Sequence, residues 1–262
     1  MVSDLFSRKL EYRDTLVFMK ADIDLSQDEF FYPVFEQVIY TRKLLENFIE
    51  KYPEFYASYE SIGDDALEHR GCKVPAIALD MARASRLCGV GPMASVAGAF
   101  SDMIAKKLYE LGAGCAIVEN GGDVAMFGER EFSLQIKTGN CIPGSNSISG
   151  KLYISINPCK ENPGSGMMGV CTSSASGGHS ISLGKSDAVT VIAKDPLLAD
   201  AAATAVGNAA KGEGAGEPVK RGLEKFNEIK NNGADLEAVI ITGGGYTGEI
   251  NMKKYLGFIS GN

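Results

Sequence analysis

The chain has 262 residues, which is enough for one large domain or two small ones with a well-buried core. Its hydrophobic content of 45% and charged content of 23% are ordinary for a globular protein. The net charge of −7 disfavours nucleic acid as a partner, because phosphate backbones are bound by basic surfaces.

The sequence contains no apolar run near the ~20 residues that a membrane span needs, and residues 1–14 lack the apolar core of a signal peptide. We therefore expect a cytoplasmic protein with no membrane partner. The six cysteines are spread singly, which argues against a zinc ribbon or a redox dithiol and indicates reduced, mostly buried thiols. Cys171 falls in a polar stretch and is the one candidate for a reactive thiol.

In the first half of the chain, residues 8–24 read as a β-hairpin. Ser26 and Glu29 form a capping box that opens a helix of roughly 20 residues. Proline and glycine bound two further helices, one over 75–89 and one that follows the GVGPM connection and ends at Gly112.

In the second half, strands cluster rather than alternate strictly with helices. Expected strands cover 115–120, 123–128, 131–137, 151–156, 188–193 and 236–242, and expected helices cover about 197–210 and 217–230. This order favours an α+β fold with a largely antiparallel sheet packed with helices. No linker rich in proline, serine or charge divides the chain, so we expect one domain over residues 1–262.

Chemically usable groups are concentrated in residues 169–210. A glycine- and serine-rich run includes Thr172, Ser173 and Ser174 and ends near His179. Consecutive backbone N–H groups in such a run can hold phosphate oxygens. The following helix carries Asp200 and Thr204 one turn apart, and a carboxylate with a hydroxyl at this spacing offers two oxygen ligands to Mg²⁺ or Ca²⁺.

Each of these features also has a purely structural explanation. Asp200 in a first helical turn complements the helix dipole, and glycine-rich runs are commonly solvated loops. A lone histidine such as His179 is more often a hydrogen-bonding group than a general base, and turn chemistry explains Asp123 as well as function does. Neither a P-loop nor a dinucleotide-binding fingerprint is present.

Four blocks, residues 91–112, 119–128, 169–179 and 187–206, occur in an order that resembles the ApbE family of FAD:protein FMN transferases. The likeness is greater to a small, uncharacterised prokaryotic group related to ApbE. The resemblance implies an ApbE-like, tunnel-fold-like antiparallel sheet. It implies Asp200 and Thr204 as Mg²⁺ ligands and His179 as the histidine that opens the family's H-I-I-D-P motif. The segments that it places around the flavin nucleotide contribute Gly121, Gly122, Asp123, Thr172, Ser173 and Ser174.

In that family, FAD is split at its pyrophosphate and FMN passes to a Thr or Ser hydroxyl of an acceptor protein. The present chain lacks the Asp-Pro of the family motif after His179, and the run 95–100 lacks the family's lysine. These departures indicate a related site with a different ligand or reaction.

We therefore expect an ApbE-related, Mg²⁺-dependent protein that binds or acts on FAD, FMN or another diphosphate nucleotide. FMN transfer and pyrophosphate cleavage are the candidate reactions, with His179 as proton acceptor. One alternative is a non-catalytic nucleotide- or flavin-binding protein. Another is an accessory protein of sulfur amino acid (homocysteine) biosynthesis, in which Cys171 is the working thiol. The Gly/Ala-rich helix faces at 94–101 and 199–210 either pack subunits of a homo-oligomer together or simply pack on the sheet.

Overall fold

The computed structural model describes residues 4–63, 67, 73–137, 151–163, 166–174 and 186–256. Within these residues, eight strands form one sheet in the order β1-β2-β3-β4-β7-β8-β9-β10, and every neighbouring pair is antiparallel. The strands are β1 (Phe6–Tyr12), β2 (Thr15–Ala21), β3 (Ala116–Asn120), β4 (Asp123–Phe127), β7 (Met167–Ser174), β8 (Ala188–Ala193), β9 (Leu236–Gly243) and β10 (Tyr246–Ile250). A separate antiparallel pair is formed by β5 (Phe132–Lys137) and β6 (Lys151–Ile156).

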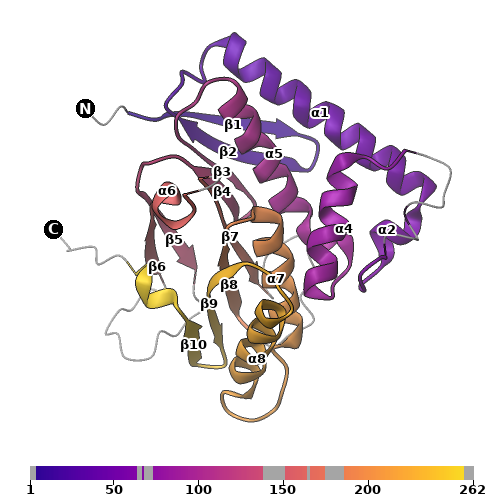
Figure 1. The fold of residues 1–262 in the computed structure, drawn as a ribbon, viewed down its shortest axis with the longest axis vertical. Coiled ribbons are helices and arrows are strands. Elements are labelled where there is room, and N and C mark those ends of the chain that lie inside the picture. Colours follow the sequence, from indigo (N-terminus) through magenta and orange to yellow (C-terminus); the bar gives the residue numbers. More distant parts are fainter. Residues whose placement is uncertain are drawn as a thin grey trace.

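Helices cover one face of the large sheet (Figure 1). They are α1 (Asp28–Lys51), α2 (Pro53–Ala57), α4 (Ala76–Cys88), the 3-10 turn η1 (Pro92–Ser95), α5 (Val96–Glu110), α7 (Pro196–Ala209) and α8 (Glu217–Asn231). The short α6 (Pro158–Glu161) and η2 (Met252–Lys254) complete the described elements. Helix α5 packs on β3 and β4, α7 packs on β7 and β8, and α8 packs on β9 and β10.

The two faces of the sheet bury separate hydrophobic cores. The larger core lies under the helices, and the smaller one joins the large sheet to β5 and β6. Successive side chains of a strand point to opposite faces, so Met168 and Val170 of β7 enter the smaller core while Cys171 enters the larger one. The face on which a β7 side chain lies therefore decides which core it meets.

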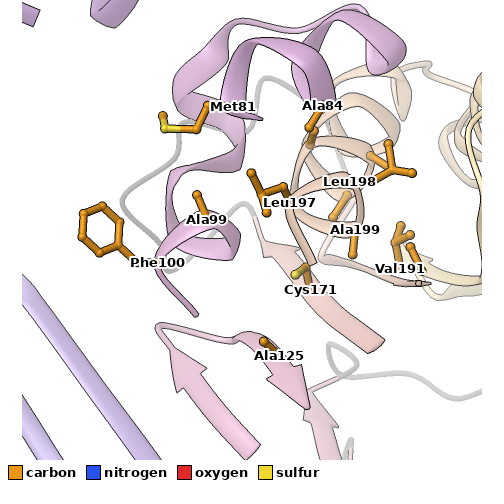
Figure 2. Close-up of a cluster of buried hydrophobic side chains, with 14 of the residues drawn as sticks. Met81, Ala84, Ala99, Phe100, Ala125, Cys171, Val191, Leu197, Leu198 and Ala199 are labelled. Atoms are coloured by element: carbon orange, nitrogen blue, oxygen red, sulfur yellow. The ribbon is translucent and has the colours of Figure 1, made fainter. Parts of the chain in front are cut away.

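Helix α7 lies at the centre of the larger core, and twelve of its fourteen residues are buried. The carboxylate of Asp195 starts the helix by accepting the backbone N–H groups of Leu197 and Leu198 at 2.9 and 3.3 Å. Gly169 of β7 lets the helix approach closely, since a Cβ there would lie 2.4 Å from Cα of Pro196. Figure 2 shows the side chains of α4, α5, β4, β7 and β8 that surround this helix.

The expected α+β class with an antiparallel sheet is confirmed. The predicted capping box at Ser26 and Glu29 is wrong, because the N-cap residue is Gln27 and it makes no side-chain cap bond. The hydroxyl of Ser26 instead bonds the carboxylate of Asp24 at 2.6 Å. Strand β10, which follows the Gly244–Gly245 turn, was not among the predicted elements.

Of the helices that the structure describes, none is by itself long and apolar enough to cross a membrane. The pair Ala76–Cys88 and Pro92–Glu110, bent by 100°, meets the length and composition limits only when the two are taken together.

Candidate functional site

Several of the predicted residues meet where α7 crosses the ends of β4 and β7. Asp123, the first residue of β4, is paired with Cys171 of β7, so their side chains lie on the same face of the sheet. That face is the one covered by α7, because the thiol Sγ of Cys171 lies 3.5 Å from the carbonyl oxygen of Pro196. Asp200 and Thr204 come from the next two turns of the same helix.

The carboxylate of Asp200 is buried against the first turn of α5. Its Oδ2 accepts the backbone N–H of Gly98 at 2.8 Å, and the backbone N–H of Ala97 also hydrogen-bonds the carboxylate. Burial, reinforced by the charge of Asp123, nevertheless raises the pKa of Asp200 well above its usual value. A carboxylate has about four lone-pair sites, so the two N–H groups leave capacity for a further ligand.

Two hydroxyl groups, one on α7 and one on β7, are buried without a hydrogen bond. Thr204 is 6% exposed and Ser173 is 8% exposed, and neither Oγ atom has a partner among the residues that the structure describes. An unsatisfied buried polar group costs roughly 1–3 kcal/mol, so native proteins seldom retain one without a bound molecule or water. Both hydroxyls therefore indicate a bound molecule or an ordered water at these positions.

The half-buried Asp123 and the buried Cys171 form a pair that sequence reasoning did not anticipate. The thiol and the backbone N–H of Thr172 hydrogen-bond the Asp123 carboxylate. Burial, with a smaller contribution from the charge of Glu119, raises the pKa of Asp123 to about 7. Burial also raises the pKa of the Cys171 thiol well above its usual value, and the negative charges of Asp123 and Asp200 act in the same direction.

The sequence predicted that Cys171 occupies a polar loop, and this prediction is wrong. Cys171 is an internal residue of β7, fully buried, and it belongs to the larger core. Reactive cysteines are partly exposed and have a lowered pKa, which is the opposite of what is found here.

The chain turns from β3 to β4 at Gly121 and Gly122, as the glycine pair predicted. Gly121 and Gly122 have φ angles of +66° and +104°, and a Cβ at either position would meet nothing within 4 Å. The side-chain amide of Asn120 donates to the carbonyl oxygen of Ala97 at 3.2 Å, which fixes the turn to the start of α5. The turn therefore lies beside the start of α5, whose backbone N–H groups hold Asp200.

Thr172 and Ser174 lie on the opposite face of the sheet from Cys171 and Ser173, because successive side chains of β7 point to opposite faces. The hydroxyls of Thr172 and Thr190 are 2.9 Å apart, on the sheet face away from α7. The expected loop also begins later than predicted, since Thr172, Ser173 and Ser174 all pair with β8. His179 lies outside the described residues, as does the remainder of the glycine- and serine-rich run.

The available donors are oxygen atoms. No group of three or more His, Cys, Asp or Glu side chains is placed to hold a metal within the described part of the chain. Asp200 and the unpartnered hydroxyl of Thr204 remain as a carboxylate and a hydroxyl on one helix. Mg²⁺ accepts such a set, because it takes one or two carboxylates and keeps several waters.

The sequence missed the N–H groups of Ala97 and Gly98 as site components. The only signal for them was the small-residue run that opens the third predicted helix, and this run does not reveal that α7 lies against it. The same holds for Asn120, whose role depends on a contact with Ala97.

Known proteins are similar to this chain over most of its length. The family model described as AbpE bacteria matches residues 8–244. The UPF0280 protein MJ1526 of Methanocaldococcus jannaschii is 37% identical over 86% of this chain and 84% of its own. The UPF0280 protein of Methanococcus vannielii is 36% identical over 94% of this chain and 91% of its own.

Two solved structures share the fold at low sequence identity. The apo flavinyl transferase ApbE of Pseudomonas stutzeri aligns with a TM-score of 0.53 and 14% identity, over 94% of each chain. The flavin transferase ApbE of Vibrio cholerae aligns with a TM-score of 0.55 and 13% identity, over 97% of this chain and 99% of its own. The expected ApbE-like fold is confirmed by these alignments.

Proposed function

This chain belongs to the AbpE bacteria family, and we propose that it binds a flavin or another diphosphate nucleotide together with Mg²⁺. Two structural neighbours of this fold are described as flavin transferases, which supports a flavin as the first ligand to test. The proposed cation ligands are Asp200 and Thr204. The β3–β4 turn and the end of β7 form the adjoining nucleotide site.

The observation that carries the proposal is that Asp200 and Thr204 are both buried and that the Thr204 hydroxyl has no hydrogen-bond partner among the described residues. Thr204 presents a buried hydroxyl without a partner, one helical turn from a buried carboxylate. The groups that shift the pKa of Asp200 include no cationic side chain among the described residues. A buried carboxylate is usually paired or bound to a metal, so a hard divalent cation satisfies both groups at once.

When bound, the cation supplies charge neutralisation at the diphosphate and orients it for attack. The N–H groups of Ala97 and Gly98 keep the Asp200 carboxylate in place throughout. In the proposed reaction, an oxygen nucleophile bonds the phosphorus of FMN, the bridging P–O bond breaks, and AMP leaves. His179 takes the proton of that nucleophile.

The nucleophile decides between the two candidate reactions. A Thr or Ser hydroxyl of an acceptor protein gives FMN transfer, and water gives pyrophosphate cleavage. The missing Asp-Pro after His179 favours a third outcome, in which the nucleotide is bound and not cleaved.

The first experiment measures flavin binding by fluorescence with and without Mg²⁺, for the wild type and for Asp200→Asn. We expect the Mg²⁺-dependent part of the affinity to be lost in Asp200→Asn. The control is Asp235→Asn, which removes an exposed acid just before the first residue of β9, at the end of that strand away from the candidate site, and should keep this affinity. Unchanged Mg²⁺-dependent affinity in Asp200→Asn contradicts the assignment.

The second experiment follows AMP release from FAD and Mg²⁺ by chromatography. AMP indicates an enzyme, and bound flavin without AMP indicates the non-catalytic alternative. The sulfur amino acid alternative has no support from the site, because it needs a working thiol and Cys171 is sealed within the core.

A further inference from the structure

Ser173 lies on the sheet face that α7 covers, the face on which Asp123 and Cys171 also lie. Along β7, every second side chain faces α7, and Gly169 and Cys171 both contact Pro196. Ser173 continues this row and is buried with them. Its hydroxyl therefore faces α7, whereas those of its neighbours Thr172 and Ser174 face the other way.

Ser173 and Thr204 are at the same level of the packed pair formed by β7 and α7. Gly169 is opposite the Cα of Pro196, and Cys171 is near the carbonyl oxygen of Pro196, so both elements advance in the same direction. From Gly169 to Ser173 the strand rises about 13 Å. From Pro196, which lies opposite Gly169, to Thr204 the helix rises about 12 Å.

The neighbouring strands offer the buried Ser173 hydroxyl no polar partner. Its partner on β8 is the apolar Val189. On the β4 side, the ladder ends at the pair Asp123 and Cys171, so the β3–β4 turn follows where the next partner would be. A side chain at Gly121 in that turn would meet open space.

We propose that the Ser173 hydroxyl is a third side-chain ligand of the divalent cation held by Asp200 and Thr204. This inference rests on the proposed cation site. The two unpartnered hydroxyls, each more than nine-tenths buried, then bind one ion through their oxygen lone pairs and keep their protons. Three protein oxygens leave three positions of an octahedral Mg²⁺ for water or phosphate oxygens.

The test is Mn²⁺ binding to the purified full chain, followed by electron paramagnetic resonance, with Mg²⁺ and Cd²⁺ as competitors. We expect Ser173→Ala to weaken Mn²⁺ binding by about tenfold, and Asp200→Asn to weaken it more. Ser173→Cys is expected to lower the affinity for Mg²⁺ and raise that for Cd²⁺, because a thiolate prefers the softer metal.

The matched control is Ser85→Ala in α4, which removes a buried hydroxyl that bonds the carbonyl oxygen of Ala82 at 3.0 Å. It is expected to bind Mn²⁺ like the wild type. A thermal melt without metal checks that each variant is folded, and Ser173→Cys nearly conserves the side-chain volume.

The outcomes separate the two proposals. If the wild type binds neither Mn²⁺ nor Mg²⁺, the proposed function fails. If the wild type binds and Asp200→Asn does not, but Ser173→Ala keeps full affinity and Ser173→Cys keeps the metal preference, only the role of Ser173 is wrong. Loss of nucleotide affinity with unchanged Mn²⁺ affinity in Ser173→Ala also overturns it, since the hydroxyl then binds phosphate instead.

Discussion

Replacing Gly98 with alanine tests the contact between α5 and α7 on which the candidate site depends. An added Cβ would lie 2.6 Å from the carbonyl oxygen of Pro196 and 2.9 Å from Cβ of Asp200. Ordinary contacts of a Cβ begin near 3.4 Å. The two helices must therefore separate by about 0.5–0.8 Å, because the atoms in the way are backbone or near-backbone atoms that cannot rotate aside.

The expected loss of stability is the difference of two terms. Overpacking a dense interior costs about 1–3 kcal/mol, and removing a glycine from a helix returns up to about 1 kcal/mol. We expect a net loss of about 1 kcal/mol in the free energy of unfolding, or about 2–4 °C in melting temperature. The same movement lengthens the 2.8 Å bond from Gly98 N to Asp200 Oδ2, so Mn²⁺ affinity also falls.

The assay is urea unfolding in the presence of EDTA, followed by a Mn²⁺ titration of the folded protein. The matched control is Gly222→Ala in α8, where the nearest atom is the terminal Cδ1 of Ile241, which can rotate away. We expect a smaller loss of stability and no loss of Mn²⁺ affinity in this control. A Gly98→Ala protein that is at least as stable as the wild type, with unchanged Mn²⁺ affinity, refutes the reasoning.

Two further predictions follow from the pair formed by Asp123 and Cys171. Because the pKa of Asp123 is raised to about 7, the folded state keeps a proton that the unfolded state loses near pH 4, and stability without metal falls as pH rises between these values. Asp123→Asn removes this pH-dependent loss of stability, so in EDTA its melting temperature should exceed that of the wild type by a margin that grows from pH 4 to pH 7. A margin that stays constant over this range contradicts the raised pKa of Asp123. Iodoacetamide should alkylate Cys171 at least tenfold more slowly than the half-buried Cys159, as read by peptide mass spectrometry. Rapid alkylation of Cys171 in the folded protein would restore the thiol hypothesis.

Much of the local structure was predictable because its signals lie within a few residues. Gly89 ends α4 in the left-handed conformation at φ +70°, and the Gly121–Gly122 pair turns β3 into β4. Asp195 and Pro196 open α7 through a side-chain cap and a proline at the first position. In each case the residues that form the boundary also encode it.

The remaining elements depend on contacts with distant parts of the chain. Strand β10 contains Thr247, Gly248 and Glu249, a composition that favours a turn, and its pairing with β9 overrides this preference. The serines at the end of β7 read as loop for the same reason, although β8 pairs with them.

The site divides in the same way. The spacing of Asp200 and Thr204 predicted that they share one face of a helix, and they are buried together in consecutive turns. The partner of Asp200 is Gly98, 102 residues away in the sequence, and no local pattern encodes that meeting. Which serine of the run faces α7 is likewise decided by the register of β7 with its neighbouring strands.

The candidate site lies between helix α7, which is buried on all sides, and the turn at Gly121 and Gly122. Substitutions are tolerated less readily in the helix than in the turn. The donors of α7 are oriented during folding, so a ligand that binds them orders little of the helix, and any substitution there also disturbs the interior. The rim at Gly121 and Gly122 has no such constraint, and Gly121, at φ +66°, has a backbone angle that asparagine tolerates. Ligand preference in this scaffold is thus most readily redesigned from the rim, with the helix left unaltered.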